Sequence, residues 1–123
     1  MNITCVIVDD EKLARDLLQE YLQQMPNIQV LGECSKGKDA VETIDKLKPD
    51  LVFLDLNMPV MNGLDCLRAI KTRLKVPIPV TIYTTSQNPA DHYRCVELGA
   101  DFLSKPHNFA TLTNVLKQKL QIN

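Results

Sequence analysis

The fold is decided by the stretch Leu51-Val52-Phe53-Leu54-Asp55, in which four apolar residues run directly into one carboxylate. A run this short and apolar is typical of a strand buried on both faces of a parallel sheet. Three other apolar runs end beside polar side chains: residues 6–8 before Asp9 and Asp10, 80–83 before Thr84, and 102–103 just before Lys105. The carboxyl ends of parallel strands meet at one edge, where open α/β sheets bind their ligands.

Helix-like patterns separate these runs without any linker. Apolar residues at helical spacing predict helices over 13–25, 40–47, 62–74, 89–98 and 109–120. One further strand is predicted over 28–32, and the run at 102–103 belongs to a strand over 100–103. Asn62 and Asn88 are suited to cap the third and fourth helices, and Gly99 to end the fourth. Five such units cannot close a barrel. We therefore predict an α/β fold, a five-stranded, doubly wound, flavodoxin-like parallel sheet.

Composition excludes several classes of protein. The chain has 123 residues and a net charge of -1, without a Lys/Arg run, which indicates one domain over residues 1–123 and gives no support for nucleic-acid or membrane binding. No apolar stretch approaches membrane-spanning length and no signal peptide is evident, so we expect a cytoplasmic location. The four cysteines form no CxxC pair, which favours reduced, half-buried thiols over disulfides or zinc ligands.

The polar residues at the strand ends are informative only as a group. Asp9 and Asp10 alone are better explained by helix capping, and Thr84 and Lys105 alone are ordinary. Asp55 lies too far from the Asn62 cap to belong to that helix. Together they supply three carboxylates, a hydroxyl and an ammonium, the groups needed to hold a divalent cation and to transfer a phosphoryl group.

These motifs resemble a known family. The resemblance lies in Val8-Asp9-Asp10-Glu11, Asp55-Leu56-Asn57-Met58-Pro59 with Gly63, Thr84, and Lys105-Pro106. Through these motifs the chain resembles the receiver domain of bacterial two-component response regulators, of the single-domain, CheY-like kind. The part through Gly63 most resembles the receivers of LytTR-type transcription regulators. Residues 99–105 form a segment one residue shorter than is usual in the family.

The resemblance implies a role for each residue. Asp55 would accept the phosphoryl group of a phosphohistidine. Mg²⁺ or Mn²⁺ would be bound directly by Asp10, by an Asp55 oxygen and by the Asn57 backbone carbonyl. Asp9 would bind the cation through water. Lys105 would neutralise phosphoryl charge, and Pro106 would follow a cis peptide bond. Thr84 and Phe102 would form the switch. The Thr84 hydroxyl would move toward the phosphoryl group, and the Phe102 ring would rotate into the space that Thr84 vacates.

The resemblance also implies partners and an output. The phosphoryl donor would be a histidine kinase or a phosphotransfer protein. An unknown downstream protein would read the face of the fourth helix, fifth strand and fifth helix, although ordinary solvated surface explains any single residue there better. The candidates on that face are Asp91, His92, Arg94, His107 and Asn108. We expect a protein that is not an enzyme beyond its own phosphorylation and dephosphorylation.

Two other classes of protein were weighed. An aspartyl-phosphate phosphohydrolase needs a second Asp two residues after its nucleophile, where this chain has Asn57. A DNA-binding regulator needs a basic or helix-turn-helix segment, and none follows Lys105. The alternative that stays open is a receiver fragment of a larger DNA-binding transcription regulator.

Overall fold

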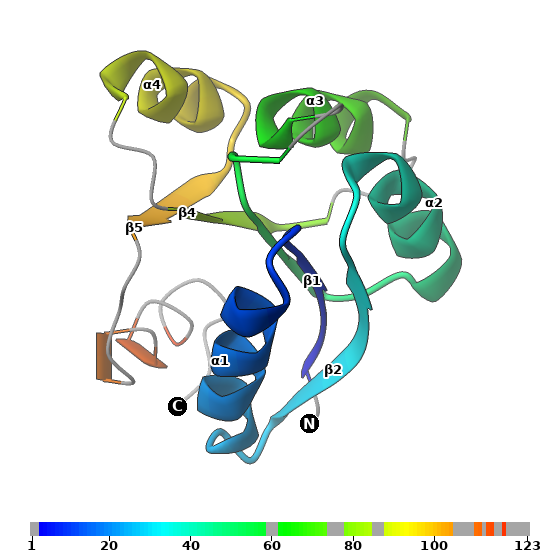
Figure 1. Cartoon of the computed structure of the whole chain (residues 1–123), viewed down its shortest axis with the longest axis vertical. Coiled ribbons are helices and arrows are strands. Elements are labelled where there is room, and N and C mark those ends of the chain that lie inside the picture. The colour runs from blue at the N-terminus through cyan, green and yellow to red at the C-terminus, as the bar shows by residue number, and fades with distance from the viewer. Residues whose placement is uncertain are drawn as a thin grey trace.

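A computed structural model of the protein describes residues 3–58, 62–73, 78–84 and 88–104, together with residues 110, 111, 113, 114 and 117. Its centre is a five-stranded parallel sheet in the order β2-β1-β3-β4-β5 (Figure 1). The strands are β1 (Ile3–Val8), β2 (Ile28–Cys34), β3 (Leu51–Leu54), β4 (Val80–Thr84) and β5 (Asp101–Ser104). The helices are α1 (Lys12–Gln23), α2 (Gly37–Leu47), α3 (Gly63–Arg73) and α4 (Pro89–Glu97). The predicted flavodoxin-like fold is confirmed.

Alternating side chains of the strands fill two cores, one on each side of the sheet. The larger core lies under α2, α3 and α4 and takes its strand residues from Val6, Val8, Val52, Leu54, Val80 and Ile82. The smaller core lies under α1 and takes them from Cys5, Ile7, Leu51, Phe53 and Tyr83. Figure 1 shows α1 on the opposite side of the sheet from α2, α3 and α4. β1 and β3 are apolar on both faces because both faces are covered.

The boundaries of the elements differ from the prediction in a few places. β5 begins at Asp101 and not at Ala100, because the Ala100 N–H donates to the Cys95 carbonyl at 3.0 Å and so still belongs to the end of α4. Gly99, with φ of 82°, makes this turn possible and is the predicted end of the helix. The five described residues of the predicted last helix are all helical.

The first helix is confirmed, but its apolar pattern is only partly buried. Leu18 and Leu22 face the smaller core, whereas Leu13 is 82% exposed.

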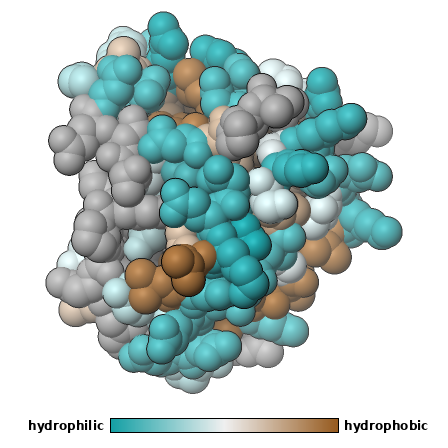
Figure 2. Space-filling model, viewed as in Figure 1, coloured by the Kyte–Doolittle hydropathy of each residue, from teal (hydrophilic) through white to brown (hydrophobic). Residues whose placement is uncertain are grey.

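Figure 2 shows the apolar side chains of one face in small patches separated by hydrophilic ones. Within the part of the chain that the structure describes, no helix combines the length and the apolar character needed to cross a membrane.

All four cysteines are free, as predicted, but they are fully rather than half buried. Burial raises the pKa of the Cys5 and Cys66 thiols to about 12 and that of Cys95 to about 11. These thiols therefore stay protonated at neutral pH and act as small apolar core residues.

Candidate phosphoryl-transfer site

Parallel pairing of β1 with β3 brings two carboxylates together. Val8 is in register with Leu54, so the next residues, Asp9 and Asp55, leave the sheet side by side. The Asp55 N–H donates to the Val8 carbonyl at 3.0 Å, and the Asp9 N–H donates to the Cys34 carbonyl of β2 at 3.0 Å. Backbone hydrogen bonds thus hold both residues at the carboxyl edge of the sheet.

Asp10 completes a cluster of three carboxylates. One oxygen from each of Asp9, Asp10 and Asp55 lies within 4.8 Å of the others. Opposite ligands of Mg²⁺ lie about 4.2 Å apart, so carboxylate oxygens this close together can share one divalent cation. Asp9 and Asp55 are buried, at 4% and 6% exposure, whereas Asp10 is exposed. The donor set therefore fits a hard cation that keeps part of its water.

Asp9 does not cap α1, which was the alternative explanation of the acidic pair. The N-cap residue is Glu11, and its side chain makes no capping hydrogen bond. Instead Asp9 Oδ1 accepts the Glu11 N–H at 2.9 Å, which fixes the turn between β1 and α1.

Arg15 braces the same turn from the side of α1, a role that the sequence did not reveal. Its Nη1 donates to the Asp9 carbonyl oxygen at 2.7 Å, and its Nε donates to Glu33 Oε1 of β2 at 3.0 Å. The Arg15 side chain is only 15% exposed. A largely buried guanidinium, paired with Glu33, thus ties the turn after β1 to β2.

Thr84 lies at the end of β4, fully buried. Asn57 Nδ2 approaches its Oγ1 at 3.5 Å, at the limit of hydrogen bonding. We had predicted a role only for the Asn57 backbone carbonyl. Its side chain adds a contact between the loop after Asp55 and the strand that carries the hydroxyl.

A close approach of α3 to the loop after Asp55 explains Gly63. A Cβ built on Gly63 would lie 2.1 Å from the Asp55 carbonyl oxygen and 2.5 Å from Leu56 Cα. The Gly63 N–H donates to the Leu56 carbonyl at 3.0 Å. Asn62 caps α3 as predicted, since its Oδ1 accepts the Asp65 N–H at 2.9 Å. Only glycine lets this helix begin against the backbone of Asp55 and Leu56.

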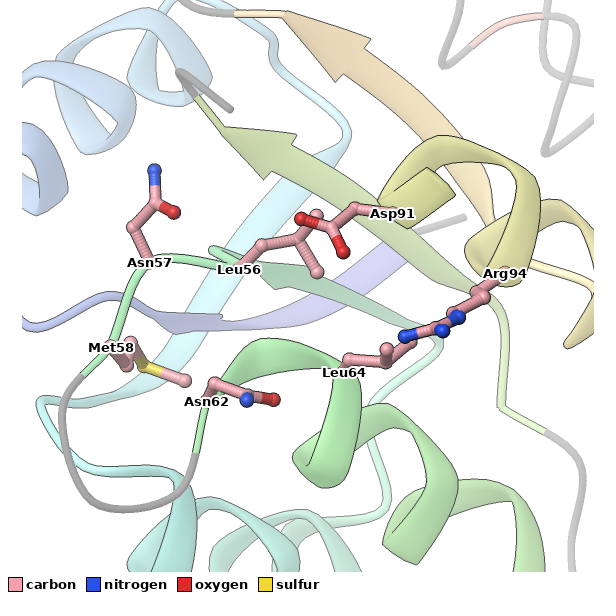
Figure 3. A pocket seen from close by; sticks show the side chains of 7 residues that line it. All are labelled: Leu56, Asn57, Met58, Asn62, Leu64, Asp91 and Arg94. Carbon is pink, nitrogen blue, oxygen red and sulfur yellow. The ribbon is translucent and has the colours of Figure 1, made fainter. Parts of the chain in front are cut away.

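A cleft of about 500 Å³ opens beside the acidic cluster, between the loop after β3 and α4. Figure 3 shows its lining, with Asn57 at one end and Asp91 and Arg94 reaching in from α4. The remaining residues of the lining are Leu56, Met58, Asn62 and Leu64. Asp91 and Arg94 were candidates for the readout face, and here both also line this cleft.

Several predicted residues lie elsewhere. Phe102, on β5, is half-buried against the larger core and stacks on His92 of α4, with ring centroids 4.3 Å apart. Lys105, Pro106, His107 and Asn108 lie outside the described residues, so the predictions about the lysine, the peptide bond and that end of the face stay predictions.

Comparison with known proteins agrees with this geometry. The family described as "Response regulator receiver domain" matches residues 5–117. Among solved structures, the response regulator domain of Thermotoga maritima CheB has a TM-score of 0.88 and 27% identity, covering 100% of this chain and 99% of that one. The Vibrio cholerae chemotaxis protein CheY4 has a TM-score of 0.81 and 26% identity, covering 96% of this chain and 98% of that one.

Curated relatives correct one expectation. A protein-glutamate methylesterase/protein-glutamine glutaminase of Clostridium acetobutylicum is 38% identical over 108 residues, which cover 85% of this chain and 31% of that protein. The Bacillus subtilis protein of the same name is 35% identical over 111 residues, covering 89% of this chain and 31% of its own length. These relatives are named as enzymes, which contradicts our expectation of a protein that is not an enzyme.

The relatives are also much longer than the matched region. The chain spans about 31% of their length, so the similarity concerns their receiver part. The narrower likeness to LytTR-type receivers stays a prediction.

The contact at Gly63 generates a test of the local packing. Gly63→Ala should lower the free energy of unfolding by about 2 kcal/mol or more, because the added methyl group meets backbone that cannot rotate away. Urea unfolding followed by circular dichroism measures this. The matched control is Gly32→Ala, where the methyl would meet only the end of the Leu47 side chain at 3.3 Å. Equal stability of the two variants would show that α3 does not press on the Asp55 loop.

Proposed function

Because this chain belongs to the response regulator receiver domain family, we propose that its Asp55 accepts a phosphoryl group from the phosphohistidine of a histidine kinase or a phosphotransfer protein. The observation that carries the proposal is the placement of Asp55, buried at the end of β3 and clustered with Asp9 and Asp10. An Asp55 oxygen forms a bond to phosphorus while the phosphorus–nitrogen bond of the donor breaks. The bonding electron pair stays on the imidazole nitrogen of the donor.

The step requires Asp55 to be ionised and its negative charge to be balanced. Three neighbouring carboxylates repel one another, and burial adds to the cost of charge on Asp55. We assign Asp10, an Asp55 oxygen and the Asn57 carbonyl as direct ligands of Mg²⁺ or Mn²⁺, and Asp9 as a ligand through water. When bound, the cation supplies charge that stabilises both the ionised acceptor and the phosphoryl oxygens. We assign Lys105, the residue that follows β5 in the sequence, the role of stabilising the negative charge of the phosphoryl oxygens.

The response to phosphorylation is assigned to Thr84 and Phe102. The Thr84 hydroxyl, whose oxygen accepts from Asn57 Nδ2, donates its own proton to a phosphoryl oxygen on Asp55. Phe102 then turns toward the vacated space, and the surface around α4 and β5 changes. A downstream protein reads that surface, with Asp91 and Arg94 among the candidate contacts. The extent of the domain, residues 1–123, and the cytoplasmic location belong to the same proposal.

The relatives favour one kind of output. Several relatives between 33% and 39% identical are named protein-glutamate methylesterase/protein-glutamine glutaminase. We infer that this receiver controls an effector of that enzymatic class, joined to it in a longer chain. Sequencing the gene beyond the codon for Asn123 tests this. An effector domain unrelated to an esterase, such as the DNA-binding domain of our earlier alternative, would contradict it.

The acceptor is tested by Asp55→Asn. Phosphorylation by acetyl phosphate or by a kinase should be abolished, because an amide cannot attack phosphorus as a carboxylate does. The control is Asp65→Asn, a carboxylate on the exposed face of α3, which should be labelled like the wild type. Acid-stable labelling of Asp55→Asn, or label mapped to Asp9 in the wild type, would overturn the assignment.

The metal ligands are tested by titration calorimetry with Mg²⁺ and Mn²⁺. Binding should be weak in the wild type, because the site offers few protein ligands. Asp10→Ala should weaken it by more than about tenfold, which is about 1.4 kcal/mol, and Asp9→Ala by less. Asp16→Ala serves as a control, since its carboxylate pairs with Lys12 on the exposed side of α1. An unchanged affinity in Asp10→Ala would rule the site out.

The sensing hydroxyl is tested by Thr84→Ala. This variant should still be labelled at Asp55 but should lose much of its conformational response, because the contact that distinguishes the two states is gone. The measurement is the change in amide NMR shifts of residues 84–112 on adding beryllofluoride, a phosphoryl mimic. Thr72→Ala removes a hydroxyl from α3 and should respond like the wild type. Equal responses in Thr84→Ala and the wild type would mean that the switch runs by another route.

A further inference from the structure

His92 and Phe102 form a stacked pair between α4 and β5. Their ring centroids lie 4.3 Å apart and their planes are inclined by 20°. Phe102 is half-buried against the larger core, whereas His92 is exposed on the first turns of α4. The imidazole therefore covers the outer side of a ring whose other side meets the core.

The stacked pair joins the amino end of α4 to β5, whereas backbone hydrogen bonds fix the carboxyl end of the helix. At the carboxyl end of α4, Gly99 and Ala100 N–H groups donate to the Val96 and Cys95 carbonyls at 2.9 and 3.0 Å, which fixes how the helix passes into β5. At its amino end, the Asn88 side chain accepts the Ala90 N–H at 3.0 Å and holds the first turn. Of the ring contacts described for these two elements, His92 with Phe102 is the one that joins the first turns of α4 to β5.

We propose that His92 is a latch that holds Phe102 in the stacked position described above and so sets how readily the receiver switches. The inference rests on the proposed function, in which Phe102 turns toward Thr84. Phe102 cannot turn inward and keep its ring parallel to an imidazole anchored on α4. Breaking the stack also releases the first turns of α4 from β5, which couples the movement of one buried ring to the exposed surface of the helix.

The strength of an aromatic pair sets the size of the expected effect. Contacts of this geometry change a two-state equilibrium by about two- to tenfold. Removing the imidazole should therefore raise the population of the inward state, and the affinity for a phosphoryl mimic should rise by the same factor, because the mimic no longer works against the stack.

The test compares His92→Ala with His92→Phe and Tyr93→Ala in the full chain. Each is titrated with beryllofluoride in the presence of Mg²⁺, and the apparent dissociation constant is read from amide NMR shifts. His92→Ala should bind about two- to tenfold more tightly than the wild type. His92→Phe keeps a stacking ring and should restore the wild-type value. Tyr93→Ala removes the neighbouring exposed ring, which is 66% exposed, and should change nothing.

The outcomes separate the latch from a purely structural role. A structural role would lower the melting temperature of His92→Ala without tightening the binding of beryllofluoride. Unchanged or weaker binding in His92→Ala, or a failure of His92→Phe to restore it, would overturn the latch. A wild type that does not respond to beryllofluoride, or a response that survives Asp55→Asn, would overturn the proposed function instead.

A second measurement tests the stack without any phosphoryl mimic. The carbon-bound protons of the His92 imidazole should be shifted upfield by the Phe102 ring current, and Phe102→Leu should abolish that shift. Imidazole shifts that are the same in the wild type and in Phe102→Leu would show that the rings do not stack in solution, which overturns the latch directly.

Discussion

The pairing of β1 with β3 is the constraint on which the rest of the structure depends. Because Val8 is in register with Leu54, the two carboxylates that follow must emerge together, and the Asp55 N–H is bound to the Val8 carbonyl at 3.0 Å. The pairing is secured by core packing on both faces, since both strands are almost entirely buried. A large apolar contribution to folding thus holds an electrostatically unfavourable cluster in place.

That cluster explains the arrangement of its surroundings. The Arg15 guanidinium donates to the Asp9 carbonyl and to the Glu33 carboxylate. An ion pair therefore helps the backbone hydrogen bonds to hold the turn after β1. Gly63 lets α3 begin against the Asp55 carbonyl, which fixes the loop on the other side. The fold therefore holds the carboxylates close together, and a bound cation would relieve the repulsion among them.

The sequence predicted the fold because apolar runs of strand length alternate with helical spacing throughout the chain. It also predicted that Asp9, Asp10 and Asp55 lie together, since all follow neighbouring parallel strands. It could not predict the Arg15 brace, which depends on where one turn of α1 directs a long side chain. The start of β5 was misplaced by one residue because the hydrogen bond from Ala100 to Cys95 follows from the turn at Gly99, not from hydropathy.

We propose above all that the convergence of β1, β3 and β4 makes Asp55 the acceptor beside a cation held by its neighbours. A crystal structure of the protein grown with Mg²⁺ and beryllofluoride tests this most directly. We predict beryllium bonded to an Asp55 oxygen, the cation on Asp10, Asp55 and the Asn57 carbonyl, and the Thr84 hydroxyl on a fluorine. Beryllium on another carboxylate, or a cation bound away from Asp10, would contradict the account.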